Sequence, residues 1–296
     1  MPEVTRRRTG ELLRKLFEIL KAAPEGLQAK EALSALADAV SLTDYESGDY
    51  QAGGRRFEQI VRFATVDCVK AGWLLKNKGL WTLTETGWEA YQELKDPELF
   101  YARATKLYRQ WRAAHPTSEP DKEQETEETA AKSVSITFEQ AEEQAWQEIK
   151  EYLLQMPPYE FQDLVAALLR AMGYFVSWVA PPGKDGGTDI IALVDPLGTK
   201  PPRIKVQVKR QKEAVNVQAV RSFIAVIGES DVGLFVCTGG FTRDAADEAR
   251  TQEKRRMRLI DLDELVDLWV KYYEKLTEEA RQHLPLKPIY FLAPAP

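Results

Sequence analysis

The chain has 296 residues, of which 44% are hydrophobic, 29% are charged and 10% are aromatic. This length favours about two domains, and the composition excludes a chain that is disordered throughout. The formal net charge of −6 is unevenly distributed, because residues 117–150 hold ten acidic residues and three lysines. The rest of the chain is close to neutral, so the acidic balance does not argue against a nucleic-acid partner.

Membrane and zinc proteins are two classes that the sequence disfavours. No apolar run reaches the roughly 18 to 20 residues of a membrane span, and the N-terminus lacks the apolar core of a signal peptide. We therefore expect a cytoplasmic protein without a membrane partner. The cysteines Cys68 and Cys237 and the histidines His115 and His283 are too few and too scattered for a zinc site. Any chemistry must use carboxylates, amides and lysine, with a metal held through oxygen.

Residues 1–114 predict a winged-helix domain. Apolar residues at helical spacing predict helices over residues 10–23, 28–40 and 55–72. The stretch "WLLKNKGLWTLTETG" then predicts a hairpin that turns at residues 77–79. Three helices followed by a hairpin form a winged helix, in which the third helix often enters a groove of DNA.

Several basic residues lie on the predicted third helix and hairpin, and we expect them to contact DNA phosphates. Such contacts position a duplex without reading its sequence. The residues are Arg55, Arg56, Arg62, Lys76 and Lys78. A solvated face of a protein-binding winged helix remains an alternative interpretation of the same residues.

Residues 115–156 predict a connection between two domains. Residues 115–133 are polar, acidic and poor in apolar residues, which is typical of a flexible linker. A helix over residues 137–154 then leads into the second domain. At the other end of the chain, residues 271–296 contain the end of a helix and a proline-rich tail.

Residues 157–270 predict a mixed α/β domain. The stretch "YEFQDLVAALLRAMGY" has a helical apolar stripe that ends at Gly173. The strands "FVSWVA", "TDIIALV" and "RIKVQVK" follow, and then helices alternate with two further strands. The order α-β-β-β-α-β-α-β-α is that of a mixed sheet flanked by helices.

Polar side chains in the second and third of these strands form a candidate active site. Alternation in "IKVQVK" places Gln207 and Lys209 on one face, and antiparallel pairing through the turn at 196–202 brings Asp189 near them. Asp189 suits a hard cation such as Mg²⁺ or Mn²⁺, with the carbonyl of Val208 or Gln207 as a weaker ligand. Lys209 would position the attacking water and offset phosphate charge, which favours metal-assisted phosphodiester hydrolysis. The alternative is that Asp189 only caps the start of its strand and that Lys209 only faces solvent.

Four blocks of the second domain resemble the Mrr-type catalytic domain of the PD-(D/E)xK nuclease superfamily. They are "YEFQDLVAALLRAMGYFVSW", "GKDGGTDIIA", "IKVQVKRQ" and "LFVCTGGFTRDAADEA". The stretch "LTDYESGDYQAGGRRFEQIVRFATVDCVKAGWLLKNKGLWTLTETG" likewise resembles the winged-helix domain that accompanies it. The resemblance implies a restriction endonuclease-like fold and metal-dependent cleavage of DNA, in particular of modified, often methylated, foreign DNA.

The resemblance also implies roles for individual residues. The aspartate of the family's Gly-Gly-x-Asp block matches Asp189, and its Gln-x-Lys pair matches Gln207 and Lys209. The first acid of the Asp-Gly-Gly stretch matches Asp185, which would be a secondary ligand or shape the turn.

One position departs from the family pattern. The family often has Phe-Glu on the first helix of this domain, where this chain has Phe161 and Gln162. Gln162 is the geometric match but brings no charge, and Glu160 is the fallback candidate for a second acid. The departure keeps open a DNA-binding sensor or regulator with weakened catalysis. A structure-selective nuclease is a further alternative, because such enzymes share the core fold.

Double-stranded DNA is the partner that this interpretation implies. Lys205, Arg210 and Lys212 lie beside the candidate site and add positive charge that could follow a phosphate backbone. Cutting both strands of a duplex needs two sites, so we expect a homodimer or higher oligomer on DNA.

Overall fold

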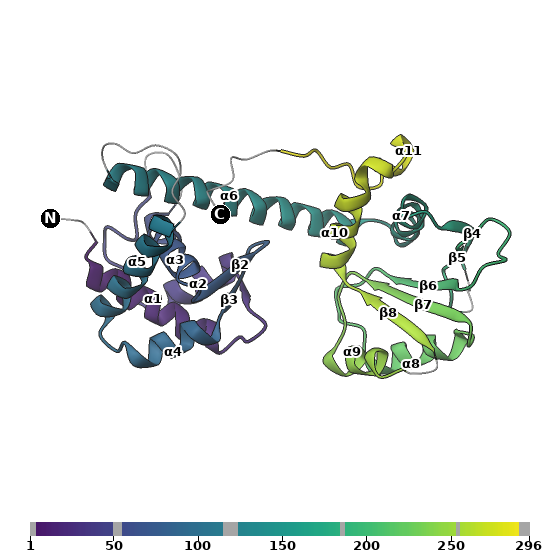
Figure 1. Ribbon diagram of the computed structural model, residues 1–296, viewed down its shortest axis with the longest axis horizontal. Coiled ribbons are helices and arrows are strands. Elements are labelled where there is room, and N and C mark those ends of the chain that lie inside the picture. Colours follow the sequence, from purple (N-terminus) through teal and green to yellow (C-terminus); the bar gives the residue numbers. More distant parts are fainter. Residues whose placement is uncertain (1–3, 50–54, 115–123, 184–186, 253–254, 290–296) are drawn as a thin grey trace. The chain divides into compact units, whose positions relative to one another are not determined.

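The described residues fold into two compact units, one within residues 4–147 and the other within residues 148–289. The computed structural model in Figure 1 describes residues 4–49, 55–114, 124–183, 187–252 and 255–289. Within these ranges no helix is both long and apolar enough to cross a membrane.

The first unit is a winged helix, as the sequence predicts. Its elements are α1 (Arg6–Lys21), β1 (Leu27–Gln28), α2 (Ala29–Ala39), α3 (Arg56–Lys70), β2 (Leu74–Asn77) and β3 (Leu80–Leu83). The strands form an antiparallel sheet in the order β1-β3-β2. The turn between β2 and β3 places Lys78 at φ 50° and Gly79 at φ 77°. Glycine adopts this left-handed conformation without steric cost, which allows the tight hairpin.

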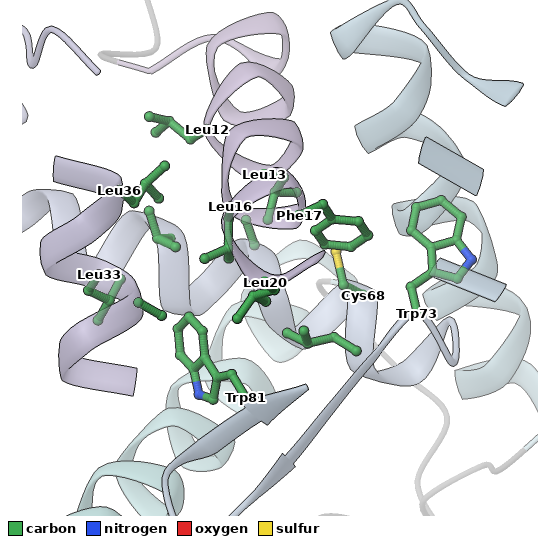
Figure 2. Close-up of a cluster of buried hydrophobic side chains, with 14 of the residues drawn as sticks. Leu12, Leu13, Leu16, Phe17, Leu20, Leu33, Leu36, Cys68, Trp73 and Trp81 are labelled. Atoms are coloured by element: carbon green, nitrogen blue, oxygen red, sulfur yellow. The ribbon is translucent and has the colours of Figure 1, made fainter. Parts of the chain in front are cut away.

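Two further helices, α4 (Glu85–Glu93) and α5 (Pro97–Ala114), complete the winged-helix core. The sequence interpretation did not include α4, although Thr84 marks its start by accepting a hydrogen bond from the amide of Gly87. Figure 2 shows the side chains of α1 beside those of α2, α3 and the hairpin strands. Phe17 meets the edge of the Phe100 ring with 5.2 Å between centroids, so α5 packs directly on α1. The α5 aromatics Phe100 and Tyr108 are buried.

The acidic segment is a helix where the sequence predicts a flexible linker. A single helix, α6 (Gln124–Gln155), runs through part of the expected linker at 115–133 and through the helix expected at 137–154. The linker prediction is therefore wrong from Gln124 onward, and residues 115–123 lie outside the described part of the chain. Residues 124–155 lack glycine and proline and are rich in Glu, Gln and Ala, which favour helix. Composition alone could not reveal the basic partners that the glutamates meet.

The second unit has the predicted α-β-β-β-α-β-α-β-α order. Its elements are α7 (Pro158–Ala171), β4 (Phe175–Val179), β5 (Ile190–Leu193), β6 (Arg203–Lys209), α8 (Val217–Val226), β7 (Asp231–Cys237), α9 (Arg243–Arg250), β8 (Arg256–Ile260) and α10 (Leu262–Tyr272). The sheet order is β4-β5-β6-β7-β8, antiparallel from β4 to β6 and parallel from β6 to β8. Figure 1 shows α8 and α9 on one face of this sheet and α7 and α10 on the other.

The chain after α10 packs back onto this unit. It forms a short 3-10 helix, Tyr273–Lys275, and the helix α11 (Glu278–Arg281). The indole of Trp269 donates a hydrogen bond of 3.1 Å to the carbonyl of Leu284, and both residues are buried. This segment is therefore part of the second unit in the structure, and the proline-rich end at 290–296 lies outside the described residues.

Candidate active site

The candidate site lies where β5 begins and β6 ends. These strands pair antiparallel, with Ile190 opposite Val206, so Asp189 lies immediately before β5 and beside the end of β6. The amide of Asp189 donates to the carbonyl of Val206 at 2.8 Å, and its Oδ2 accepts from the amide of Val208 at 2.6 Å. Asp189 thus bonds to the residues on both sides of Gln207. The carboxylate is buried, with 7% of the residue exposed.

Gln207 and Lys209 alternate with apolar residues along β6. Val206 is buried on the face that carries Ile190, whereas Gln207 and Lys209 lie on the opposite face. The ammonium of Lys209 lies 5.7 Å from the ring centroid of Phe235 on β7. Phe235 belongs to the apolar cluster formed with α8 and α9, so Lys209 reaches the site from the side of these helices. The structure therefore brings Asp189, Gln207 and Lys209 to one end of the β5–β6 pair.

The α7 residue connected to this arrangement is Gln162. It is buried, and its Nε2 donates to the carbonyl of Ala180 at 2.8 Å. The amide of Ala180 in turn donates to the carbonyl of Asp189 at 2.8 Å. Gln162 therefore braces the backbone that carries Asp189. Glu160 lies exposed in the first turn of α7 and takes no part in these bonds, and Asp185 lies outside the described residues.

A Gln162→Leu variant is expected to lose about 1 to 3 kcal/mol of unfolding free energy, because the buried carbonyl of Ala180 is left without its donor. DNA cleavage by the folded variant should also fall, since the segment before Asp189 loses its brace. Chemical denaturation followed by cleavage at matched folded fractions measures both effects. Gln218→Leu, an exposed change of the same type on α8, is the control. Equal stability and cleavage in both variants would contradict the bracing role.

The oxygen groups at this site fit a hard divalent cation. The set comprises the carboxylate of Asp189, immediately before β5, with the amide oxygen of Gln207 and the peptide carbonyl of Val208 on β6. Mg²⁺ prefers such oxygen ligands and keeps several waters. No cluster of three or more His, Cys, Asp or Glu side chains that could hold a metal is present in the described ranges. Any cation held here would therefore depend strongly on Asp189.

Two basic residues predicted to follow DNA near the site have structural partners. The ammonium of Lys205 donates to the carbonyl of Val226, the last residue of α8, at 2.5 Å. The guanidinium of Arg210 donates to the carbonyl of Leu154, near the end of α6, at 2.6 Å. Both cations satisfy carbonyls at a helix C-terminus, where positive charge is favourable. Both cations are half-buried and bonded to the protein backbone, whereas Lys212 is exposed. That these residues contact phosphate stays a prediction.

Two of the basic residues predicted to bind DNA in the winged helix are covered by α6, Arg62 being buried and Lys76 partly buried. Arg62 pairs with Glu139 at 2.9 Å and with Glu143 at 2.8 Å, both on α6. Lys76 pairs with Glu139 at 2.7 Å, and burial lowers the pKa of Lys76 while this carboxylate opposes the shift. Arg62 and Lys76 thus do not face solvent in this structure, contrary to the prediction from the sequence. The reason is that α6 covers them.

The remaining cations of the predicted DNA-binding set differ in their surroundings. Arg55 is exposed and lies 4.0 Å from Glu58. The guanidinium of Arg56 lies 4.6 Å from the ring centroid of Tyr45. At the tip of the hairpin, the backbone amide of Lys78 donates a hydrogen bond of 3.2 Å to the carboxylate of Glu142, and its ammonium lies 4.7 Å from the ring centroid of Trp146.

The sequence interpretation missed the glutamates of α6 that contact the basic residues of the winged helix. A signal was present, since Ile136, Glu139, Glu143 and Trp146 recur at three- and four-residue spacing and so form one helical stripe. Ile136, Glu139 and Trp146 are buried along it. Glu139, Glu142 and Glu143 lie on or beside this stripe. Such a pattern indicates a helix face that packs against another part of the protein and pairs with basic residues there.

Two protein-family models match the chain. The model described as restriction endonuclease, Mrr_cat, matches residues 153–269, and the Mrr N-terminal domain model matches residues 10–93. A curated relative from Escherichia coli (strain K12), the type IV methyl-directed restriction enzyme EcoKMrr, is 26% identical over 276 residues. The match covers 86% of this chain and 89% of that relative.

Two solved structures of restriction endonucleases are less similar to this chain in sequence. The DNA modification-dependent restriction endonuclease AspBHI is 20% identical with a TM-score of 0.37, over 46% of this chain and 38% of that one. The MspJI restriction endonuclease in complex with a 27-mer oligonucleotide is 17% identical with a TM-score of 0.33, over 60% of this chain and 42% of that one. The chain thus spans less than half of either solved protein.

Proposed function

Since its two matched regions make the chain a member of the Mrr-type restriction endonuclease family, we propose that it is a divalent-metal-dependent endodeoxyribonuclease that restricts modified foreign DNA. Mg²⁺ is the proposed cofactor, with Mn²⁺ as a substitute. Methylated duplex DNA is the proposed substrate, because the E. coli relative that this chain covers almost fully is named as methyl-directed.

The observation that carries the proposal is that Asp189 is hydrogen-bonded to Val206 and Val208, the two neighbours of Gln207 on β6. The buried carboxylate of Asp189 accepts a hydrogen bond of 2.6 Å from the backbone amide of Val208, which holds it in one orientation. A rigid support of this kind is what a metal ligand or catalytic group requires, because misplacement by about 1 Å is costly for rate. Gln162 extends the support from α7 through Ala180.

The proposed reaction is hydrolysis of a phosphodiester bond. A water oxygen bonds to phosphorus, the bond from phosphorus to the leaving strand's oxygen breaks, and that oxygen takes up a proton. When bound, a divalent cation supplies Lewis-acid activation of the phosphate and a more acidic water. Asp189 would hold the cation, with oxygens of Gln207 and Val208 as weaker ligands. Lys209 would orient the attacking water and offset the negative charge that develops on the phosphate.

Positive charge for holding DNA would come from residues on both units. Arg55 and Arg56 on the winged helix and Lys212 beside the candidate site are the proposed phosphate contacts. Two copies of the chain would act on one duplex, because each site cuts one strand. We therefore propose a homodimer or higher oligomer on DNA.

A cleavage panel tests this function. Methylated, unmethylated and branched DNA are incubated with the purified chain in Mg²⁺, in Mn²⁺ and in EDTA. We expect cleavage of methylated duplex in either metal and none in EDTA, because a site with one carboxylate depends on the cation for its electrophilic charge. Cleavage that persists undiminished in EDTA after dialysis would contradict the metal-dependent mechanism.

The same panel distinguishes the rival functions. A DNA-binding sensor with lost catalysis is the second candidate, and the observation that favours it is the amide of Gln162, which provides no second carboxylate. Tight DNA binding without cleavage of any substrate in either metal would establish the sensor and overturn the nuclease. Preference for branched over linear duplex would instead point to a structure-selective nuclease.

A further inference from the structure

The acidic face of α6 is bonded to the basic face of the winged helix. Glu139 accepts three hydrogen bonds, from Arg62 at 2.9 Å, from the ammonium of Lys76 at 2.7 Å and from the indole of Trp81 at 3.0 Å. Glu143 accepts from Arg62 at 2.8 Å. The basic residues come from α3 and β2, which are the third helix and the first hairpin strand of the winged helix.

The hairpin tip takes part in the same contact. The carboxylate of Glu142 accepts from the amide of Lys78 at 3.2 Å, and the ammonium of Lys78 lies over the ring of Trp146. A Cβ added at Gly79 would lie 3.2 Å from the Cβ of Glu143, so helix and hairpin are in close contact. Hereafter the α6 residues 139–146 are called the acidic cover.

The surface below the acidic cover has the chemistry of a site for a nucleic-acid backbone. It presents arginine and lysine from the third helix and hairpin of a winged helix, the two elements that commonly contact DNA in this fold. The cover presents carboxylates at three- and four-residue spacing, which places them on one side of the helix. Each carboxylate carries one negative charge, as does each phosphate of DNA. The acidic cover therefore offers Arg62 and Lys76 the type of partner that DNA would offer.

The contact is incomplete at one atom, which favours its exchange. The Nε of Arg62 is buried and makes no hydrogen bond within the described part of the chain. An arginine has five donor hydrogens in a fixed fork, so the two glutamates leave part of it unsatisfied. A buried donor without a partner raises the free energy of the covered state. Buried ion pairs also carry a desolvation cost, which reduces their net contribution.

We propose that the acidic cover is a built-in competitor of DNA, and that a duplex reaches Arg62, Lys76 and Lys78 only when α6 is displaced from the winged helix. The proposal rests on DNA being the substrate, as proposed above. In the covered state the winged helix binds duplex weakly. When DNA binds, phosphates of its backbone replace the carboxylates of the acidic cover as partners of these basic residues. The helix α6 then no longer contacts the basic face.

A charge-neutral cover tests the competition. In the full chain, Glu142→Gln with Glu143→Gln removes two carboxylates while both amides can still accept hydrogen bonds. Binding of an unmodified duplex is measured by fluorescence anisotropy at about 0.1 M salt, without divalent metal so that no cleavage occurs. We expect about tenfold tighter binding than for the wild-type chain, within the usual range of coupling between competing sites. Circular dichroism and thermal unfolding verify that the variant is folded.

The matched control changes two glutamates elsewhere on the same helix. Glu148→Gln with Glu151→Gln gives the same change in net charge at exposed positions outside the cover. Screening limits such distant charges, so we expect less than about a twofold change in affinity. Equal gains in the two double variants would overturn the proposal, because the effect would then be a general one of net charge.

A reversible crosslink tests displacement directly. Cysteines at Gly79 and Glu143 lie within a few tenths of an ångström of disulfide spacing, and the native Cys68 and Cys237 are buried. Backbone strain at position 79 is common to both redox states, so it cancels in the comparison. We expect the oxidised form to bind duplex at least about fivefold more weakly than the reduced form. Equal binding by both forms would overturn the proposal.

These outcomes separate failure of the competition from failure of the nuclease. If the chain binds and cleaves DNA but neither the neutral cover nor the crosslink changes affinity, only the competitor proposal is wrong. If no variant binds duplex even at low salt, both proposals are wrong. If the neutral cover tightens binding while all forms lack cleavage, the competitor stands and the protein is a sensor.

Discussion

An Asp189→Asn variant is expected to cleave DNA about a thousandfold more slowly than the wild-type chain while keeping its fold. The asparagine oxygen can still accept the hydrogen bond from the amide of Val208, which Oδ2 of Asp189 accepts at 2.6 Å. The local backbone should therefore be retained. The negative charge that would hold the cation is lost, and a single electrostatic group at an active site accounts for about a hundred- to a thousandfold in rate.

The measurement is single-turnover cleavage of methylated duplex in Mg²⁺, with thermal unfolding of the same preparations. Asp195→Asn is the matched control, because Asp195 lies beyond the other end of β5 in an exposed turn. Its carboxylate accepts from the amides of Leu197 and Lys200, and these bonds lower its pKa. That control can alter stability but should leave the cleavage rate of folded protein unchanged. Cleavage by Asp189→Asn within about threefold of wild type would contradict the site assignment.

The order of elements in the second unit could be predicted because its core residues recur with regular periods. On α7, Phe161, Leu164, Val165 and Leu168 are buried at helical spacing. On β6, alternation separates Val206 from its polar neighbours, and the antiparallel pairing then brings Asp189 to the end of that strand. These features depend on residues close in sequence or joined by a short turn.

Partners far apart in sequence could not be predicted in this way. Arg210 bonds to a residue 56 positions earlier, and Lys205 to one 21 positions later. Both lysine and arginine near a strand end look solvated when only neighbours are considered. Their role at helix C-termini depends on how α6 and α8 pack, which no local pattern contains.

The acidic segment is a second case in which contacts between residues far apart in the sequence could not be predicted. Composition suggested a solvated linker because the segment has many carboxylates and few apolar residues. The segment is instead helical from Gln124 onward. Further along the same helix, in the part predicted to be helical, Glu139 lies 8% exposed between Arg62 and Lys76, more than 60 residues away in the sequence. This contact explains why two predicted DNA contacts are covered, an error that came from treating the charges of the winged helix and of α6 separately.

A Lys209→Met variant is expected to lose at least about a hundredfold in single-turnover cleavage rate with little change in DNA affinity. Methionine retains an unbranched apolar side chain near Phe235, where the ammonium now lies 5.7 Å from the ring centroid. Packing should therefore survive, and the lost charge is the main change. A group that offsets charge developing on the phosphate acts on the chemical step, whereas a phosphate contact made before reaction acts on binding.

Cleavage rate and affinity must therefore be measured separately, with affinity determined in the absence of divalent metal. Lys200→Met is the control, because Lys200 is an exposed lysine at the opposite end of the β5–β6 pair. Lys209→Arg should restore charge but only a small part of the rate, since a planar guanidinium places its donors differently from an ammonium. If Lys209→Met weakened binding and left the rate of bound DNA unchanged, Lys209 would be a phosphate contact. Loss of rate at constant affinity, together with poor rescue by arginine, would place its ammonium at the reacting phosphate.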